Sequence, residues 1–309
     1  MPSNSSPLPS IPPGIIGGLG TIVRDELLFV DSFPKADSKT TAVGYQPQVG
    51  GPVPTALAQL AKLGHATKFL GSWGNDLIGD AIEADLREAR IGFDRDCCRR
   101  LIHSGFAHIW VDAARGTRTV VAVPPEGAPK VTEAVALGNE TSWLHIDGWG
   151  GPAVLAAAEA TVAAGGIVSL DTGSPKPTTE RLLRMAQVVN VPRYFLREFF
   201  GTDDLDAGAR RVLEMGPRLV TVTDGPAGAG IWVNGFSLWL AAPRVRVIDT
   251  CGAGDVFCGG LIDGIRRGLE PSDVLRTAMG TACWKIGRKG NRDALCDRAQ
   301  LTDFLSRHF

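Results

Sequence analysis

One glycine-rich stretch constrains the fold of this chain more than any other: residues 249–260, which read Asp-Thr-Cys-Gly-Ala-Gly-Asp-Val-Phe-Cys-Gly-Gly. Alternating polar and apolar residues at 244–248 predict a strand before it, and apolar residues at helical spacing within 256–265 predict a helix after it. Gly252 and Gly254 favour a tight turn between the two and leave no side chains over the first amides of the helix. Unpaired N–H groups and the positive end of the helix dipole make such a terminus a phosphate site.

Asp255 is the unusual member of this stretch, because a carboxylate in a phosphate site repels a bound phosphate. Its chemical task would be to accept a proton from a substrate hydroxyl that attacks the phosphate. The alternative is that Asp255 only complements the helix dipole, and short glycine motifs are weak evidence by themselves. An Asp at a helix N-terminus is expected to have a lowered pKa, so positioning would matter more than basicity.

The whole string from 249 to 255 closely resembles the C-terminal signature of the PfkB, or ribokinase-like, carbohydrate kinases. The resemblance implies that the amides of Gly252, Ala253 and Gly254 form an anion hole for the transferred phosphoryl group. It also implies that Asp255 is the catalytic base.

Two N-terminal segments are similar to the sugar-binding part of the same family. Residues 50–56, Gly-Gly-Pro-Val-Pro-Thr-Ala, resemble its Gly-Gly-x-x-x-Asn-x-Ala signature, and residues 20–25 resemble its Gly-x-x-Asn-x-Asp segment. The implied substrate contacts are Asp25, Gly50, Gly51 and Thr55. Thr55 and Val23 stand where Asn is usual, so the sugar specificity of ribokinase does not transfer. The alternatives are a solvated turn residue at position 25 and an ordinary amphipathic helix after the two glycines.

The implied nucleotide site draws on later segments. Residues 223–228 resemble the family's Thr-x-Gly-x-x-Gly turn, and residues 278–292 supply a helix and a loop that flank the adenine in that family. The implied ATP contacts are Thr223, Gly225, Gly228 and Met279. Carbonyl groups from the loop 288–292 would join Asp249 around a potassium ion. A plain strand-to-hairpin turn is the alternative for residues 223–228.

One departure from the family concerns magnesium. The family's Asn-x-x-Glu motif is replaced by residues 192–195, Pro-Arg-Tyr-Phe, and Glu198 follows nearby without an assigned role. Mg2+ is still expected, because it neutralises charge on the transferring phosphates. We assign it no protein ligand.

Strand and helix patterns alternate from Trp143 onward, which predicts a doubly wound, mostly parallel α/β sheet with ligands beyond the carboxyl ends of its strands. Residues 15–33 predict two strands around a turn that carries Asp25. Residues 104–123 predict two more strands, with the turn between them at Arg115-Gly116.

The resemblance implies that strands within 20–50 and 103–124 form a small β-sheet that lids the sugar. One ribokinase-like kinase domain would span 15–309. The Ser- and Pro-rich segment 1–14 would be a disordered tail.

Composition narrows the functional classes. At 309 residues, with 44% hydrophobic and 21% charged residues, the chain fits one large domain. A net charge of −1 disfavours nucleic-acid and membrane-surface binding, and 6 cysteines without metal-type spacing favour a reducing cytoplasm. The N-terminus lacks a leader pattern, and the apolar residues 152–170 fit a buried helix and strand. A P-loop kinase is disfavoured because no Gly-x-x-x-x-Gly-Lys-Ser/Thr occurs.

These patterns lead to the hypothesis of an ATP-dependent kinase that phosphorylates a primary hydroxyl of a small sugar, with ATP, Mg2+ and K+ as cofactors. Thr55 and the basic loop 288–292 look more like the ketose-directed branch that includes sulfofructose kinase, so a ketohexose or an acidic derivative phosphorylated at C1 is favoured. A solvated loop beside ATP is the alternative for 288–292. The partners would be the sugar and ATP, and the resemblance allows a homodimer formed through the lid. The alternative functions are ribokinase- or nucleoside-kinase-type activity, or non-catalytic binding of a sugar or nucleotide on the same fold.

Overall fold

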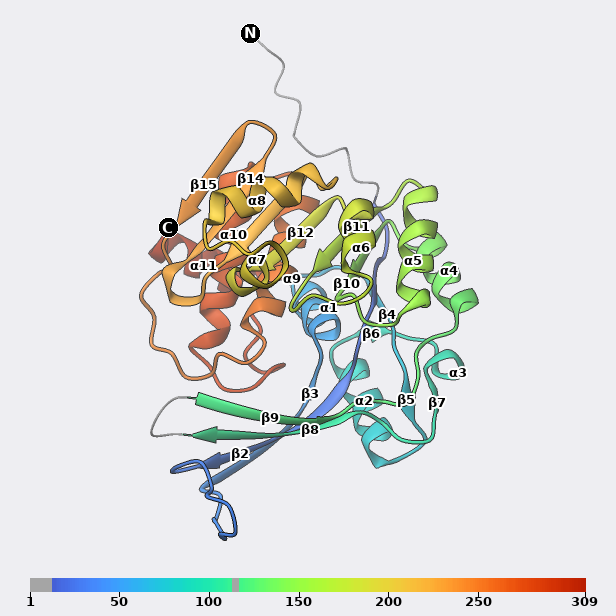
Figure 1. The fold of residues 1–309 in the computed structure, drawn as a ribbon, viewed down its shortest axis with the longest axis vertical. Coiled ribbons are helices and arrows are strands. Elements are labelled where there is room, and N and C mark those ends of the chain that lie inside the picture. Colours follow the sequence, from blue (N-terminus) through green and yellow to red (C-terminus); the bar gives the residue numbers. More distant parts are fainter. Residues whose placement is uncertain (1–12, 113–116) are drawn as a thin grey trace.

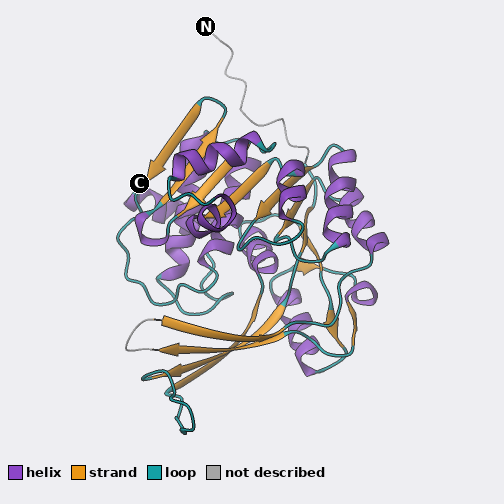
Figure 2. Ribbon diagram, in the orientation of Figure 1, coloured by secondary structure: helices purple, strands orange, loops and turns teal. Residues whose placement is uncertain are grey.

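The computed structural model describes residues 13–112 and 117–309. The predicted tail at 1–14 therefore falls almost wholly outside the described residues, as does the predicted turn at Arg115-Gly116. No helix in the two described ranges is both long and apolar enough to cross a membrane. Figure 2 shows helices packed around a central run of strands, with a second group of strands at one side.

A large sheet of nine strands forms the centre of the described chain. Its strands lie in the order β15 (Phe236–Leu240), β14 (Ala229–Val233), β13 (Leu219–Thr223), β12 (Val188–Pro192), β11 (Ile167–Asp171), β10 (Trp143–Ile146), β1 (Ile16–Leu19), β4 (Thr67–Leu70) and β6 (Ile91–Gly92). Every neighbouring pair from β13 to β6 is parallel, and only the last two pairs, which join β13, β14 and β15, are antiparallel.

Helices cover both faces of this sheet. The connection from β1 to β4 and the connection from β10 to β11 run in opposite directions across the sheet, and right-handed crossovers then place their helices on opposite faces. On one face α1 packs against α9 and α9 against α10, and on the other α5 packs against α4 and α6 (Figure 1). The helices are α1 (Pro52–Lys62), α2 (Leu77–Glu88), α3 (Arg95–Cys98), α4 (Val131–Glu140), α5 (Pro152–Ala163), α6 (Thr179–Met185), α7 (Arg193–Phe200), α8 (Leu205–Glu214), α9 (Ala253–Arg266), α10 (Pro271–Ile286) and α11 (Arg298–His308). The prediction of a doubly wound, mostly parallel sheet is confirmed.

A second sheet of four strands, here called the small sheet, completes the described fold. Its order is β3 (Gly44–Gly50), β2 (Val23–Val30), β8 (Phe106–Asp112) and β9 (Thr117–Val123). Leu27, Ala107 and Ile109 form a separate apolar cluster on it. Figure 1 shows these long strands projecting from the helical body. The loop after α10 contacts the sheet, because Asn291 Nδ2 donates to the Val49 oxygen at 3.2 Å and Lys289 lies over the ring of Phe29.

Asp25 lies on strand β2 and not on the predicted turn. The turn between β1 and β2 occupies residues 20–22, and Val23 already pairs with Gly50. Strand β2 begins this early because it gains hydrogen-bonded partners on both sides, β3 and β8. Asp25 is therefore fixed opposite Gln48 of β3.

Residues 244–248 form no strand, so the strand predicted before the glycine-rich turn is wrong. The N–H groups of Ile248 and Asp249 donate to the carbonyl oxygen of Ile286, at 2.7 and 3.1 Å, so these amides bond to the end of a helix. The side chain of Val247 is 57% exposed, which removes the burial that an alternating pattern usually reflects. The glycine-rich stretch is thus approached by a loop fixed to the end of α10, and the helix predicted after it is α9.

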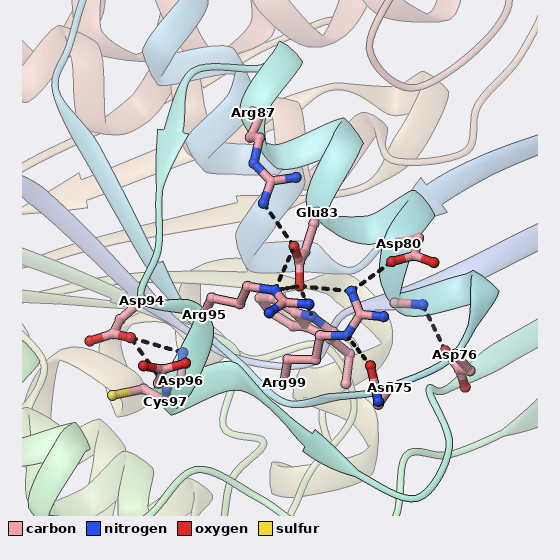
Figure 3. A network of polar contacts seen from close by, with 12 residues as sticks. Asn75, Asp76, Asp80, Glu83, Arg87, Asp94, Arg95, Asp96, Cys97 and Arg99 are labelled. Carbon is pink, nitrogen blue, oxygen red and sulfur yellow. Dashed lines mark hydrogen bonds and ion pairs between the residues drawn. The ribbon is translucent and has the colours of Figure 1, made fainter.

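A charged network surrounds α2 and lies beside the chain that leads to the small sheet (Figure 3). Asp76 accepts hydrogen bonds from the backbone N–H of Gly79 at 2.7 Å and of Ser104 at 2.8 Å. It therefore caps α2 and fixes the chain that enters β8. Beside it β5 (Trp73–Gly74) pairs with β7 (Arg99–Leu101), and this short ribbon leads toward the small sheet.

Candidate active site

The site begins where the connections of the large sheet change direction, between β1 and β10. Ligands of open α/β sheets bind at such a point, beyond the carboxyl ends of the strands. Asp147 follows β10 directly and accepts hydrogen bonds there from the backbone N–H groups of Thr21, at 3.1 Å, and Trp149, at 2.9 Å. A side chain at Gly20 would place its first carbon 2.6 Å from Asp147 Oδ2, so only glycine fits at this crossing.

Three carboxylates converge on this edge of the sheet: Asp147 after β10, Asp171 at the end of β11, and Asp255 in the first turn of α9. The pKa of Asp255 is raised to about 7, first by burial and then by the charges of Asp171 and Asp147, against the lowering effect of Arg292 and Lys285. Burial likewise raises the pKa of Asp147 to about 7 and raises the pKa of Asp171. The lowered pKa expected for Asp255 from the helix dipole alone is wrong, because burial among like charges outweighs the dipole.

The charge of Lys176 acts on both Asp147 and Asp171, yet the pKa of each carboxyl stays raised. The Nζ of Lys176 donates to the carbonyl oxygens of Thr172 and Ser174, each at 2.9 Å, and so bonds to backbone oxygens rather than to either carboxylate. Burial lowers the pKa of Lys176, while the two carboxylates raise it. The site is therefore rich in buried carboxylate and poor in directly paired cation.

The start of α9 presents open backbone to these carboxylates. Gly252 is the N-cap, with φ 75° and ψ 6° in the left-handed region that favours glycine. Nothing lies within 4 Å of the position that a side chain at Gly254 would take, and Gly254 is exposed. No side chain covers the start of α9 at these glycines, although the Ala253 N–H donates to the Thr250 carbonyl oxygen at 3.3 Å, and the helix dipole there favours an anion.

Asp25 lies on the small sheet with its side chain turned to the chain that leads into α1. It is 7% exposed, and a side chain at Gly50 would come within 2.2 Å of its Oδ2. Burial raises the pKa of Asp25 to about 6, against the lowering effects of a hydrogen bond from Gln48 and of the charge of Arg292. Gly50 is needed for this close approach, and Gly51, at φ 115°, is the N-cap of α1.

Short contacts link Asp25 to the glycine-rich stretch. Gln48, the strand partner of Asp25, places its Nε2 3.9 Å from the sulfur of Cys251. A side-chain carbon at Gly252 would lie 3.5 Å from the Thr55 methyl group and 3.7 Å from Asp255 Oδ2. The structure thus brings together residues that are some 200 positions apart in the sequence, as expected for one site.

The side chain of Thr55 is hydrogen-bonded to Arg292. It is fully buried, and its Oγ1 accepts a hydrogen bond from Arg292 Nη1 at 3.2 Å. The same guanidinium pairs with Asp85 of α2, with 3.0 Å between Nε and Oδ2. Arg292 lowers the pKa of both Asp25 and Asp255 by its charge. Thr55 therefore positions a cation beside the two carboxylates.

The residues predicted to bind the nucleotide differ in how accessible they are to a ligand. Thr223 ends β13, and Gly225 begins a turn at φ 49° with nothing within 4 Å of its missing side chain. Gly228, at φ 119°, would meet the Leu240 carbonyl oxygen at 2.0 Å if it carried a side chain, so it is required by the hairpin. Met279 is 3% exposed and packs in the main core, which leaves it little surface for a ligand.

Asp249 precedes the glycine-rich turn and organises it through four hydrogen bonds. Its Oδ1 accepts from the Cys251 N–H at 2.9 Å. Its Oδ2 accepts from the Gly290 N–H at 3.2 Å and from Lys285 Nζ at 2.9 Å. The backbone oxygen of Asp249 accepts from the same Lys285 Nζ at 3.0 Å.

A sequence model of the pfkB family of carbohydrate kinases matches residues 19–297 of this chain. The chain belongs to this family. It is 24% identical to ketohexokinase of Mus musculus over 286 residues, which cover 88% of this chain and 96% of that protein. It is 26% identical to fructokinase of Klebsiella pneumoniae over 267 residues, which cover 75% and 82%. The solved ribokinase of Arabidopsis thaliana, complexed with ribose and ATP, shares the fold with a TM-score of 0.80 at 20% identity, over 95% of this chain and 98% of that chain.

The sequence analysis of this carbohydrate kinase missed several polar residues of the site: Gln48, Asp147, Asp171, Lys176, Lys285 and Arg292 as a partner of Thr55. Asp147 and Asp171 carried a usable signal, because each ends a buried strand and parallel strands bring such ends to one edge. Gln48 and Lys285 carried none, because their roles depend on pairing with strands and loops far away in the sequence.

Proposed function

We propose that this carbohydrate kinase transfers the γ-phosphoryl group of ATP to the C1 hydroxyl of a ketose, with Asp255 as the base. One observation supports this most directly: the carboxylate of Asp255 lies beside the glycine-lined start of α9, and its pKa is raised to about 7. A general base works best when its pKa lies near the operating pH. A carboxylate that only complemented the helix dipole would be expected to have a lowered pKa.

Each proposed site residue has a distinct part in the reaction. Asp25 would accept hydrogen bonds from sugar hydroxyls, beside Gly50, Gly51 and the Thr55–Arg292 pair, and so orient the sugar. The attacking hydroxyl would give its proton to Asp255 while its oxygen forms a bond to the γ-phosphorus. The bond from that phosphorus to the bridging oxygen breaks, and ADP leaves. The amides of residues 252–254 would face the negatively charged oxygens of the phosphoryl group during its transfer.

Thr223 and Gly225 are the proposed contacts for the ATP phosphates, because they lie at the carboxyl end of β13 with open space beside the turn. Gly228 would shape the turn through its hairpin, without touching ATP. Met279 is proposed to support the nucleotide site from beneath, because its side chain is buried. Arg193, in the segment that replaces the Asn-x-x-Glu motif, pairs with Asp224 at 2.9 Å and fixes the same turn.

The residues present fit a magnesium ion carried by ATP better than one held by the protein. Within residues 13–112 and 117–309, no group of three or more His, Cys, Asp and Glu side chains could hold a metal. The undercompensated carboxylates of Asp171 and Asp255 would nevertheless attract a cation bound to the phosphates. Such an ion would neutralise charge on the transferring group.

The preference for a ketose rests on the relatives named ketohexokinase and fructokinase, while the structural likeness to ribokinase keeps ribose as the alternative. ADP release with fructose, an anionic ketose derivative, ribose and adenosine tests the choice. We expect a ketose to have the highest kcat/KM. A preference for ribose or adenosine of about 100-fold in kcat/KM, roughly 2.7 kcal/mol, would refute the ketose as substrate without contradicting the kinase activity.

We also propose that the small sheet closes over the sugar and that two copies pair through it. Tyr45 and Val121 are 58% and 51% exposed on this sheet, and β9 is an edge strand, features that favour association. Light scattering of the purified protein should give a dimer, and a monomer at assay concentrations would contradict it. A cytoplasmic location and the absence of nucleic-acid or membrane partners stay predictions from composition.

A further inference from the structure

Lys285 is a fully buried lysine with an unusual pair of acceptors. It lies in the last turn of α10, and its side chain is 0% exposed. Its Nζ donates to the backbone oxygen of Asp249 at 3.0 Å and to Asp249 Oδ2 at 2.9 Å. A buried ammonium must be paired and hydrogen-bonded to be tolerated, and here a single residue supplies both acceptors.

Both oxygens belong to Asp249, the residue that the sequence analysis expected to hold potassium together with carbonyl groups of the loop 288–292. Carbonyl and carboxylate oxygens are the ligands that hard cations prefer. In this chain an ammonium already bonds to both, and the Oδ1 of the same carboxylate is taken by the Cys251 N–H. A potassium ion on these oxygens would lie directly against a second positive charge. The residues present therefore do not fit the expected ion at Asp249.

We propose that Lys285 is a built-in replacement for the monovalent cation, so that this kinase works without potassium. The ammonium provides the same single positive charge at Asp249. It also lies at the C-terminal end of α10, where the helix dipole favours a cation. The charge is delivered by the chain and needs no ion from solution.

Lys285 acts on the anion hole as a positioning residue, through Asp249. The carboxylate that it holds accepts from Cys251, the residue before Gly252, and from Gly290 in the loop that carries Arg292. The backbone of the same segment is bonded to the end of α10, since Ile248 and Asp249 both donate to the Ile286 oxygen. Without the ammonium, the Asp249 carboxylate would no longer be held in place to accept from Cys251 and Gly290.

The first test compares salts at constant ionic strength, and this part rests on the proposed kinase activity. We expect kcat of the wild-type enzyme to change by less than about twofold among potassium, sodium and N-methylglucamine chlorides. Lys285→Met, which keeps the apolar volume and removes the charge, should lower kcat by about tenfold or more in every salt. Lys285→Ala, which opens space for an ion, should lose as much in N-methylglucamine and regain most of it in potassium or ammonium chloride.

Melting curves without substrate provide a second readout that needs no turnover. The melting temperature of the wild type should be indifferent to the cation, and that of Lys285→Ala should rise when potassium replaces N-methylglucamine. Lys62→Ala, an exposed lysine of α1, is the matched control and should behave as the wild type.

Three results would overturn the proposal: wild-type activity that depends on potassium, full activity of Lys285→Met, or a loss in Lys285→Ala that no cation reverses in either readout. If no sugar is phosphorylated under any condition, the kinase proposal fails while the melting curves still decide the role of Lys285.

Discussion

Two carboxylate sites in this protein are built in opposite ways. Glu83, 3% exposed, is surrounded by cations: Arg87 at 2.8 Å, Arg95 at 3.1 Å and Arg99 at 3.1 Å (Figure 3). Burial would raise the pKa of Glu83, but hydrogen bonds from Arg87, Arg99 and Trp73 lower it overall. At Asp255 burial and the charges of Asp171 and Asp147 together raise the pKa to about 7.

The difference teaches that burial of a carboxylate does not by itself mark a functional site. What separates the two is the compensation of charge: the chain neutralises Glu83 and leaves Asp147, Asp171 and Asp255 undercompensated. Maintaining such a cluster costs stability, and strongly perturbed groups of this kind gather where chemistry needs them. The Glu83 network instead holds α2 and the entry to the small sheet.

The largest expected effect comes from removing the proton acceptor. Asp255→Asn keeps the shape of the side chain and should lower kcat by about a thousandfold, as expected for loss of a general base. ATP affinity and melting temperature should stay at or above the wild-type values, because an undercompensated charge has been removed. Turnover comparable to the wild type would take Asp255 out of the mechanism.

A smaller effect is expected on sugar binding. Asp25→Asn should raise KM for the sugar by about 30-fold, from the loss of roughly 2 kcal/mol in hydrogen bonds to a charged group. KM for ATP should change little, because Asp25 lies on the small sheet, away from Thr223 and Gly225. Calorimetry that finds unchanged sugar affinity would contradict the placement of Asp25 in the sugar site.

The smallest effect is expected at Glu83, the carboxylate that is paired with arginines. Its loss should lower stability and leave catalysis unchanged. Glu83→Gln leaves three arginines without their common anion and should lower the melting temperature by roughly 4 °C. The kcat of the folded enzyme should be unchanged, because no residue of this network faces the glycine-rich stretch. A fall in kcat with an unchanged melting temperature would contradict a purely structural role for Glu83.

Local patterns in the sequence predicted much of this architecture. The alternation of strands and helices after Trp143, the glycine turn before α9 and the two signatures all have their signal within a few consecutive residues. The prediction for 244–248 was wrong because alternation cannot reveal whether a neighbouring strand exists. Asp25 was assigned to a turn because the pairing of β2 with β3 and β8 is set by chain far from it.

The electrostatics of the site were harder to predict for the same reason. The raised pKa of Asp255 comes from its burial in the folded chain and from Asp171 and Asp147, which are about 100 positions away in the sequence. A lysine in an amphipathic helix normally reads as a surface residue, so nothing around Lys285 indicated that it would be buried against Asp249. Local sequence can name a carboxylate, but the three-dimensional neighbours decide its charge.

The pH dependence of ATP-dependent sugar phosphorylation tests the central claim most directly, with the sugar phosphate identified by 31P NMR. A base must be ionised to accept a proton, and the pKa of Asp255 is raised to about 7 in the free enzyme. We therefore predict that kcat/KM falls as the pH drops below an apparent pKa near 7 and levels off above it, with the residual rate of Asp255→Asn lacking this step. A profile that stays flat from about pH 5 to pH 8, or the same step in Asp255→Asn, would contradict the account.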